Sequence, residues 1–291
     1  MLILAFLLLP TTLARAEPIV AKADLFLLSL GKLDLSSETI TADFWLTVNC
    51  DGECPKLTPE IIGGRIVSAT PIVNTPTTRS WRVYATLQPK LDLRLFPFDR
   101  QRVEISLEDG QLGADALRLV PANTATGVDR DVRVVGWNIA GWTIAEHTSD
   151  YAGDTYSRLT FEVELEKPVL SAFLKTLLPL CFILAIMLSS YVMDTDKIKE
   201  RIGMASAALT AAVMFHVAVG NQMPLTGYLT FADKCFIVVY TVTLGTVILN
   251  LRILQLQQAA RADAALRLNA LGRKLVPIGV PVTVAPLLLL V

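Results

Sequence analysis

The segment between Arg201 and Asp233 contains no Asp, Glu, Lys or Arg, yet it is long enough to cross the roughly 30 Å hydrocarbon core of a bilayer. One face of the predicted helix is small or weakly polar, at Gly203, Ala207, Thr210, Met214, Val217 and Asn221. A helix that only contacts lipid does not need such a stripe, which suits close helix packing or a wall facing water. The charged residues precede the segment, at Lys197, Lys199, Glu200 and Arg201. The pattern therefore predicts a helix that lines an ion pore.

The composition places this helix in a membrane protein. The chain has 291 residues, 53% of them hydrophobic, with a net charge of −1 and a mean hydropathy of +0.50. Apolar residues are clustered, as in membrane proteins, and the near-neutral charge without a basic tail argues against a nucleic-acid partner. The motifs of zinc proteases, serine hydrolases and P-loop enzymes are absent, and two histidines far apart offer little for catalysis. We expect neither an enzyme nor a cofactor.

The N-terminus predicts export. Residues 1–16 are apolar and end in Ala-Arg-Ala, an A-x-A cleavage pattern typical of a signal peptide. The stretch lacks a basic n-region, so an uncleaved anchor is the alternative. Exported space is oxidising, which makes Cys50 and Cys54 candidates for a disulfide. No other Cys or His lies near this pair, which argues against a metal site.

The chain changes character near Pro168. Residues 17–167 carry short runs with period-two alternation, which predict strands of an all-β antiparallel sandwich with Trp137 and Trp142 in its core. These runs are 26–35, 39–48, 80–89, 102–109, 137–147 and 158–167. Residues 168–291 predict an all-α four-helix transmembrane domain, with spans of about 172–193, 202–220, 231–251 and 275–291.

Charge predicts the topology of these spans. The loop 194–201 and the linker 252–274 are basic, whereas the loop 221–230 has no Lys or Arg. Basic loops belong in the cytoplasm, so both termini and the sandwich are expected outside, in the extracellular space or periplasm beyond the cell (inner) membrane. The linker is rich in Ala, Leu, Gln and Arg, which predicts a helix continuing from the third span.

Three motifs give the chain a family resemblance. They are FPFDRQ at 96–101, Leu178-Pro179 inside the first span, and ERIGMASAALTAAVMFHVAVGNQMPLTGYLTFADKC at 200–235. Together they resemble the prokaryotic branch of the pentameric ligand-gated ion channels (Cys-loop receptor superfamily), which lacks the signature cysteines. The resemblance implies a homopentamer in membrane lipid, an agonist site between extracellular sandwiches, and permeating ions in a pore lined by the second span. The stripe would then face the axis, with Met214 and Val217 as an apolar constriction.

The resemblance also assigns a selectivity residue. Glu200 matches the family's intracellular acidic ring, and five carboxylates at one mouth would concentrate cations. The alternative is that Glu200 pairs with Lys197 or Arg201 at the helix start. The Pro-Ala insertion of anion-selective relatives is absent before Arg201, which favours cations.

Coupling residues follow from the same resemblance. Pro97 and Asp99 belong to the signature loop, and Asp99 would pair with Lys167, where relatives have Arg. Lys lacks the bidentate fork, so a weaker and more mobile pair is expected. Asp34 and Glu38 would rest on the facing loop after Pro224, which carries Leu225, Thr226 and Tyr228. Solvated charges at a domain edge are the alternative for Asp34 and Glu38.

The gating stimulus stays open between a small ligand, a proton and a divalent cation. His216 lies in the pore segment but off its stripe, so we expect an interhelical hydrogen bond, with a proton sensor as the alternative. Tyr151 and Tyr156 occupy the place of the family's capping loop over the ligand, although two exposed tyrosines in a hairpin are ordinary. A non-conducting membrane sensor or adhesion protein with the same architecture is the rival function.

Overall fold

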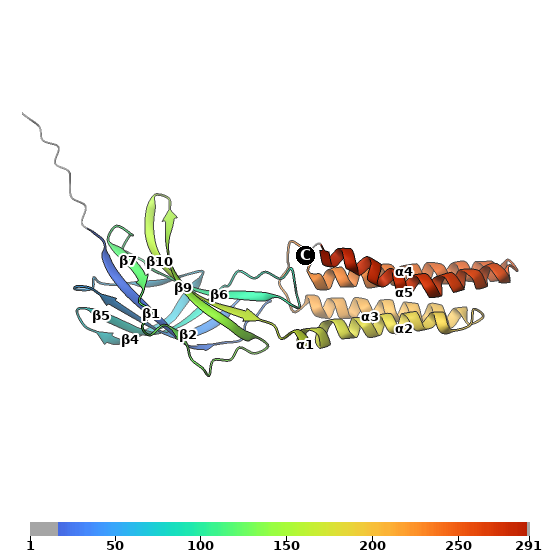
Figure 1. Cartoon of the computed structure of the whole chain (residues 1–291), viewed down its shortest axis with the longest axis horizontal. Coiled ribbons are helices and arrows are strands. Elements are labelled where there is room, and N and C mark those ends of the chain that lie inside the picture. Colours follow the sequence, from blue (N-terminus) through green and yellow to red (C-terminus); the bar gives the residue numbers. More distant parts are fainter. Residues whose placement is uncertain (1–16, 290–291) are drawn as a thin grey trace, which may run out of the picture.

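The computed structural model describes residues 17–289, with the backbone only from residue 277 onward. The predicted signal peptide, residues 1–16, lies outside the described residues. The molecule is elongated, with strands at one end and helices aligned along the long axis at the other (Figure 1). The change of character at Pro168 is thus the boundary between two kinds of structure.

Two sheets form a sandwich. The first has the order β4-β5-β2-β1-β7, with β8 beside β1, and the second has the order β3-β6-β10-β9. The strands are β1 (Ile19–Leu30), β2 (Ile40–Cys50), β3 (Pro59–Ile62), β4 (Gly64–Asn74), β5 (Thr78–Leu87), β6 (Arg100–Asp109), β7 (Leu117–Pro121), β8 (Gly127–Val128), β9 (Asn138–Tyr151) and β10 (Asp154–Glu166).

The pairing is antiparallel except at β1, which pairs in parallel with β7 and β8. The prediction of a purely antiparallel sandwich is wrong at this edge. The chain passes from β6 in one sheet to β7 in the other, so no hairpin forces β7 to run antiparallel to its new neighbour.

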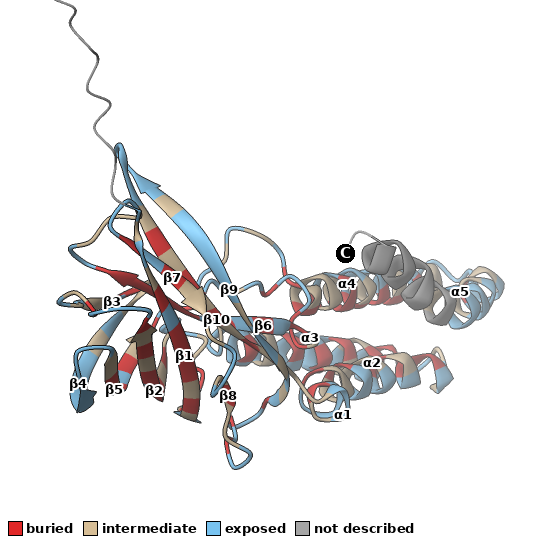
Figure 2. Cartoon of the chain, turned by 60° about the vertical axis from the view of Figure 1, so that its left-hand side comes forward, coloured by how far each residue is buried: buried red, intermediate tan, exposed pale blue. Residues whose placement is uncertain are grey.

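Alternate residues of β1, β2, β5, β6 and β10 are buried, as Figure 2 shows by colour, whereas β9 has no fully buried residue. Phe44 and Phe161 are fully buried, and Trp137 is 8% exposed. Trp142 is 41% exposed, so its prediction as core is wrong. Its ring stacks on Phe161 with centroids 5.5 Å apart, but β9 is the edge strand of its sheet and leaves the other side of the indole uncovered.

The helical part begins with an irregular first helix. It comprises α1 (Val169–Ala172), a π turn (Phe173–Leu177), α2 (Leu178–Ser189) and a 3-10 turn (Ser190–Val192). Pro179 explains the π turn, because proline has no amide hydrogen and its ring clashes with the carbonyl one turn earlier.

The remaining helices are α3 (Ile198–Gly220), α4 (Phe231–Gln258) and α5 (Ala262–Leu289). Within the described residues, three helices are long and apolar enough to cross a membrane: Val169–Val192, Ile198–Gly220 and Phe231–Gln258. The fourth span, 275–291, stays a prediction. The backbone of α5 returns toward the sandwich, as an even number of crossings requires (Figure 1).

The helix of the third span continues into the linker 252–274 as predicted, but only to Gln258, so the prediction that one helix extends through the linker is wrong. Ala260 has φ 56°, and the Arg261 and Ala260 amides donate to Leu256 O and Gln257 O at 2.9 and 3.1 Å. These two bonds form a Schellman motif that ends α4. Glycine normally takes the left-handed position, so alanine there leaves no signal in the sequence.

Candidate functional site

The predicted pore stripe lies on an uncovered face of α3. Glu200, Gly203, Ala207, Thr210, Met214, Val217 and Asn221 are all exposed. The opposite face is buried against the other helices, at Arg201, Ala205, Ala208, Ala212 and Val219. The subunit's own helices therefore leave the small, uncharged face of α3 free.

Glu200 stands at the start of this face. Among the ion pairs of residues 17–289, none joins Glu200 to Lys197 or Arg201, so the structure does not support that alternative. Arg201 instead turns into the bundle, with its guanidinium carbon 5.3 Å from the centre of the Tyr191 ring.

At the other end of the bundle, the signature loop is inserted among the helices. Leu93 and Phe96 are 1% and 3% exposed, and they share a buried cluster with Leu180, Ala232 and Phe236. The Phe96–Pro97 peptide bond is cis. A loop of the sandwich is thus part of the helical core.

Backbone hydrogen bonds attach this loop to α4. The Phe231 and Ala232 amides donate to Arg94 O and Phe96 O at 2.8 and 3.1 Å. The first amides of a helix have no partner within it, so the loop carbonyls supply what the helix lacks. A capping box satisfies two further amides, because the Asp233 amide donates to the Thr230 side chain and the Thr230 amide donates to the Asp233 side chain.

Tyr228 reinforces the same junction. Its hydroxyl accepts a 2.9 Å hydrogen bond from the Leu93 amide, and the Arg94 guanidinium lies 5.2 Å from its ring centre. Pro224 is partly buried and Leu225 is exposed. Of the residues predicted in this loop, Tyr228 is the one with a defined contact to the sandwich.

The predicted pairing of Asp99 with Lys167 is present. Lys167 Nζ lies 3.7 Å from Asp99 Oδ1, and Gln101 Nε2 donates to Asp99 Oδ2 at 2.7 Å. The ammonium also lies 4.3 and 4.9 Å from the ring centres of Phe96 and Trp137. Burial lowers the pKa of Lys167, against the opposing effect of the Asp99 charge. The rings of Phe96 and Trp137 therefore position the Lys167 ammonium, which cannot form a bidentate ion pair with Asp99.

Asp34 and Glu38 do not reach the facing loop through any contact recorded in the described chain. Asp34 Oδ1 accepts from Ser36 Oγ at 2.8 Å and from the Ser36 amide at 3.0 Å, which organises its own turn. Glu38 is exposed with φ 52°. Leu35, between them, packs against both the sandwich core and the helical cluster. The sequence reasoning selected the charges and missed this leucine, whose signal was the apolar alternation of Leu33 and Leu35.

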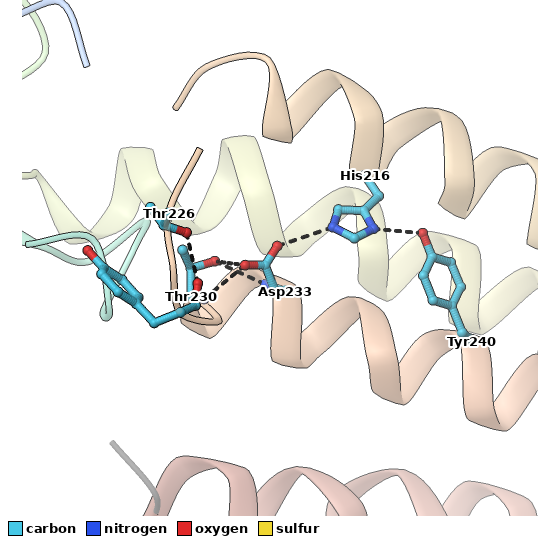
Figure 3. Close-up of polar contacts among 6 residues, drawn as sticks. His216, Thr226, Thr230, Asp233 and Tyr240 are labelled. Carbon is cyan, nitrogen blue, oxygen red and sulfur yellow. Dashed lines mark hydrogen bonds and ion pairs between the residues drawn. The ribbon is translucent and has the colours of Figure 1, made fainter. Parts of the chain in front are cut away.

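His216 joins α3 to α4, as its position off the stripe predicted. Its Nδ1 lies 2.9 Å from the Tyr240 hydroxyl and its Nε2 lies 3.1 Å from Asp233 Oδ1 (Figure 3). The imidazole stacks on Phe236 with centroids 4.3 Å apart. Asp233 Oδ2 accepts from the Thr230 amide and hydroxyl at 2.8 and 2.9 Å. One carboxylate therefore links α3 to the end of α4 that holds the signature loop.

No family model matches the sequence, but two known channels do. A proton-gated ion channel of Gloeobacter violaceus is 21% identical over 252 residues, which cover 77% of this chain and 70% of the relative. The neuronal acetylcholine receptor subunit alpha-10 of Rattus norvegicus is 22% identical over 169 residues, covering 57% of this chain and 38% of the relative. Both relatives are ion channels, and the similarity to them supports the resemblance to the pentameric ligand-gated ion channels.

The similarity to these channels agrees with three coarse predictions. The relatives are channels and not enzymes, the apolar helices indicate a multi-pass membrane protein, and channel relatives imply a homo-oligomer with permeating ions. The ligand, the ion preference and the residues that carry them remain to be proposed.

The predicted ligand candidates lie on the β9–β10 hairpin. Tyr151 and Tyr156 are 5.7 Å apart between ring centroids, edge to face. Tyr151 contacts the Arg158 guanidinium and donates to Glu108 at 3.3 Å, while Arg158 Nε donates to Glu108 Oε1 at 2.6 Å. Tyr151 is thus tied to the Glu108–Arg158 ion pair and Tyr156 packs on Tyr151, while the ligand role of both stays a prediction. Elsewhere in the sandwich, Cys50 and Cys54 form a disulfide with an S–S distance of 2.11 Å.

Proposed function

We propose that the chain is one subunit of a homopentameric ligand-gated channel that conducts cations through a pore lined by α3. The observation that carries this proposal is the exposed, uncharged stripe of α3 opposite a buried face. Five copies around an axis would place five such stripes against water. The sandwich, 17–167, would stand outside the cell (inner) membrane and the helices, 168–291, within it.

Cation preference is proposed from Glu200. It is exposed three residues before Gly203, so it continues the stripe at the proposed cytoplasmic mouth. Five carboxylates in a narrow ring would raise the local cation concentration. Current recording with Glu200→Gln tests this point, with Lys199→Gln as a matched control at the neighbouring exposed position. Loss of cation preference in Glu200→Gln alone is expected, and an unchanged reversal potential would contradict the assignment.

Cysteine accessibility tests the pore face. In a background without Cys181 and Cys235, single cysteines at Thr210 and Met214 should be blocked by a charged thiol reagent applied during current flow. Cysteines at Ala208 and Ala212, on the buried face, should react slowly or not at all. Equal block at both sets would remove α3 from the pore.

The contacts of His216 favour a proton as the gating stimulus. Neutral His216 can donate from Nε2 to Asp233 while Nδ1 accepts from Tyr240. Protonation would make Nδ1 a donor and add a charge opposite Asp233, changing both links between α3 and α4. The Gloeobacter relative, named as proton-gated, supports the same idea. The pH response between 4 and 8 should shift in His216→Gln, and an unchanged response would leave a small ligand or a divalent cation.

The rival function is a non-conducting sensor or adhesion protein. It needs no ion pathway, so wild-type protein in planar bilayers would carry no current under acid, amines or divalent cations. Such a result, with the protein shown to be folded and oligomeric, would favour the rival.

A further inference from the structure

Buried polar groups without partners gather in one layer of the helical bundle. Such atoms belong to five side chains there: Ser190, Tyr191, Arg201, Asn250 and Asn269. The other such atom in the described chain is Asp99 Oδ1, which has the Lys167 ion pair. Buried polar groups nearly always have partners, and a cluster of exceptions indicates a bound water or ion.

Helical spacing brings three of these side chains together. Ile198, Ile253 and Ala265 form one buried cluster between α3, α4 and α5. Arg201, Asn250 and Asn269 lie one turn from these residues, in each case toward the sandwich end of the bundle. They therefore form the next layer, directly on top of an apolar one.

Tyr191 closes this layer. Its ring centre lies 5.3 Å from the Arg201 guanidinium carbon, and a Cβ at Gly272 of α5 would lie 3.1 Å from its Cε1. The tyrosine thus spans from α3 to α5. Ser190, Tyr191, Arg201 and Asn250 are at most 3% exposed, so these four side chains are closed off from the solvent, whereas Asn269 is partly exposed.

The chemistry of the layer is that of an anion site. Nε, Nη1 and Nη2 of Arg201, Nδ2 of Asn250 and the Ser190 hydroxyl can all donate hydrogen bonds, and none of these atoms has a partner in the described part of the chain. The Tyr191 hydroxyl is within reach of Thr246, and the unpartnered acceptors Asn250 Oδ1 and Asn269 Oδ1 would take hydrogen bonds from water. No carboxylate of residues 17–289 forms an ion pair with Arg201. The Tyr191 ring face offsets part of the charge but satisfies no N–H group. An unpaired buried guanidinium is costly, so a negative charge is missing here.

We propose that this layer binds a small monovalent inorganic anion, such as chloride, together with ordered water. The donors belong to the 3-10 turn, α3 and α4, and their burial leaves room for a small ion rather than a lipid headgroup. The inference does not depend on ion conduction, because it concerns the packing of a single subunit.

Bromide provides a direct test on the unmodified protein. Crystals of the full chain grown in bromide should show an anomalous peak within hydrogen-bond distance of Arg201. Density for water alone at this position would overturn the proposal.

Thermal unfolding tests the same site in solution. At constant sodium and ionic strength, replacing gluconate by chloride should raise the unfolding temperature in a saturable way, by about 3 °C or more at saturation. Arg201→Met, which replaces the charge by an apolar chain of similar length, should fold and lose this dependence. Lys199→Met removes an exposed charge two residues away and should retain it. Equal chloride dependence in Arg201→Met and wild type would overturn the proposal.

Discussion

The Tyr228 hydroxyl accepts a 2.9 Å hydrogen bond from the Leu93 amide, which joins the loop after α3 to the sandwich. Tyr228→Phe removes that acceptor and leaves a buried amide unpaired, a loss of about 1 kcal/mol or more. If this contact transmits motion, the stimulus for half-maximal current should rise about fivefold, which is that energy expressed as a ratio. Tyr84→Phe, an exposed tyrosine on β5, should leave the response unchanged. An unaltered Tyr228→Phe response would place the coupling elsewhere.

The Asp99–Lys167 pair should act as a unit. Lys167→Met removes the ion-pair partner of Asp99 Oδ1 and leaves the Asp99 carboxylate, which is 1% exposed, as an unpaired buried charge. We therefore expect a loss of about 3 kcal/mol in unfolding free energy. The double variant with Asp99→Asn should lose less than the sum of the two single variants.

Lys167→Arg keeps the charge and is the matched control for the pair. Denaturant unfolding followed by tryptophan fluorescence measures the cycle, because all four tryptophans lie in the sandwich. Strict additivity of the two single changes would show that the pair is not coupled.

Acid sensitivity of the sandwich should depend on Asp24. Burial alone would raise the pKa of Asp24, but hydrogen bonds from Thr124, Ala125 and Thr126 outweigh it and lower that pKa. The stabilisation is therefore fully present above the unfolded pKa of about 3.9 and is lost as the pH falls through the lower folded value. Asp24→Asn should cost about 1–2 kcal/mol at neutral pH, allowing for solvent screening, and flatten the acid limb of stability. Asp51→Asn, at an exposed ion pair, should keep the wild-type acid limb.

Sequence patterns predicted most of the architecture because the change from period two to continuous apolar runs at Pro168 depends only on local burial. They could not locate the end of α4, since Ala260 adopts a conformation usually marked by glycine. They also grouped Arg201 with the charges that precede the uncharged segment, whereas the structure buries it completely. Glu200 is exposed and Arg201, the next residue of the helix, is buried. The charge of a residue does not show which face of the helix it occupies.

In the described chain, the turn between β1 and β2 contacts the helical domain through an apolar side chain and not through its charged ones. We therefore expect packing, and not charge, to couple the sandwich to the helices. Leu35 packs on both cores, whereas the neighbouring Asp34 bonds within its own turn and Glu38 is exposed. Leu35→Ala should therefore cost about 1–3 kcal/mol, below the full range for a buried leucine, and should weaken the current response. Glu38→Gln keeps the backbone and shape and should change stability by less than about 0.5 kcal/mol. Unfolding and current recorded on both variants decide the point, because a larger functional change in Glu38→Gln would restore the electrostatic interpretation.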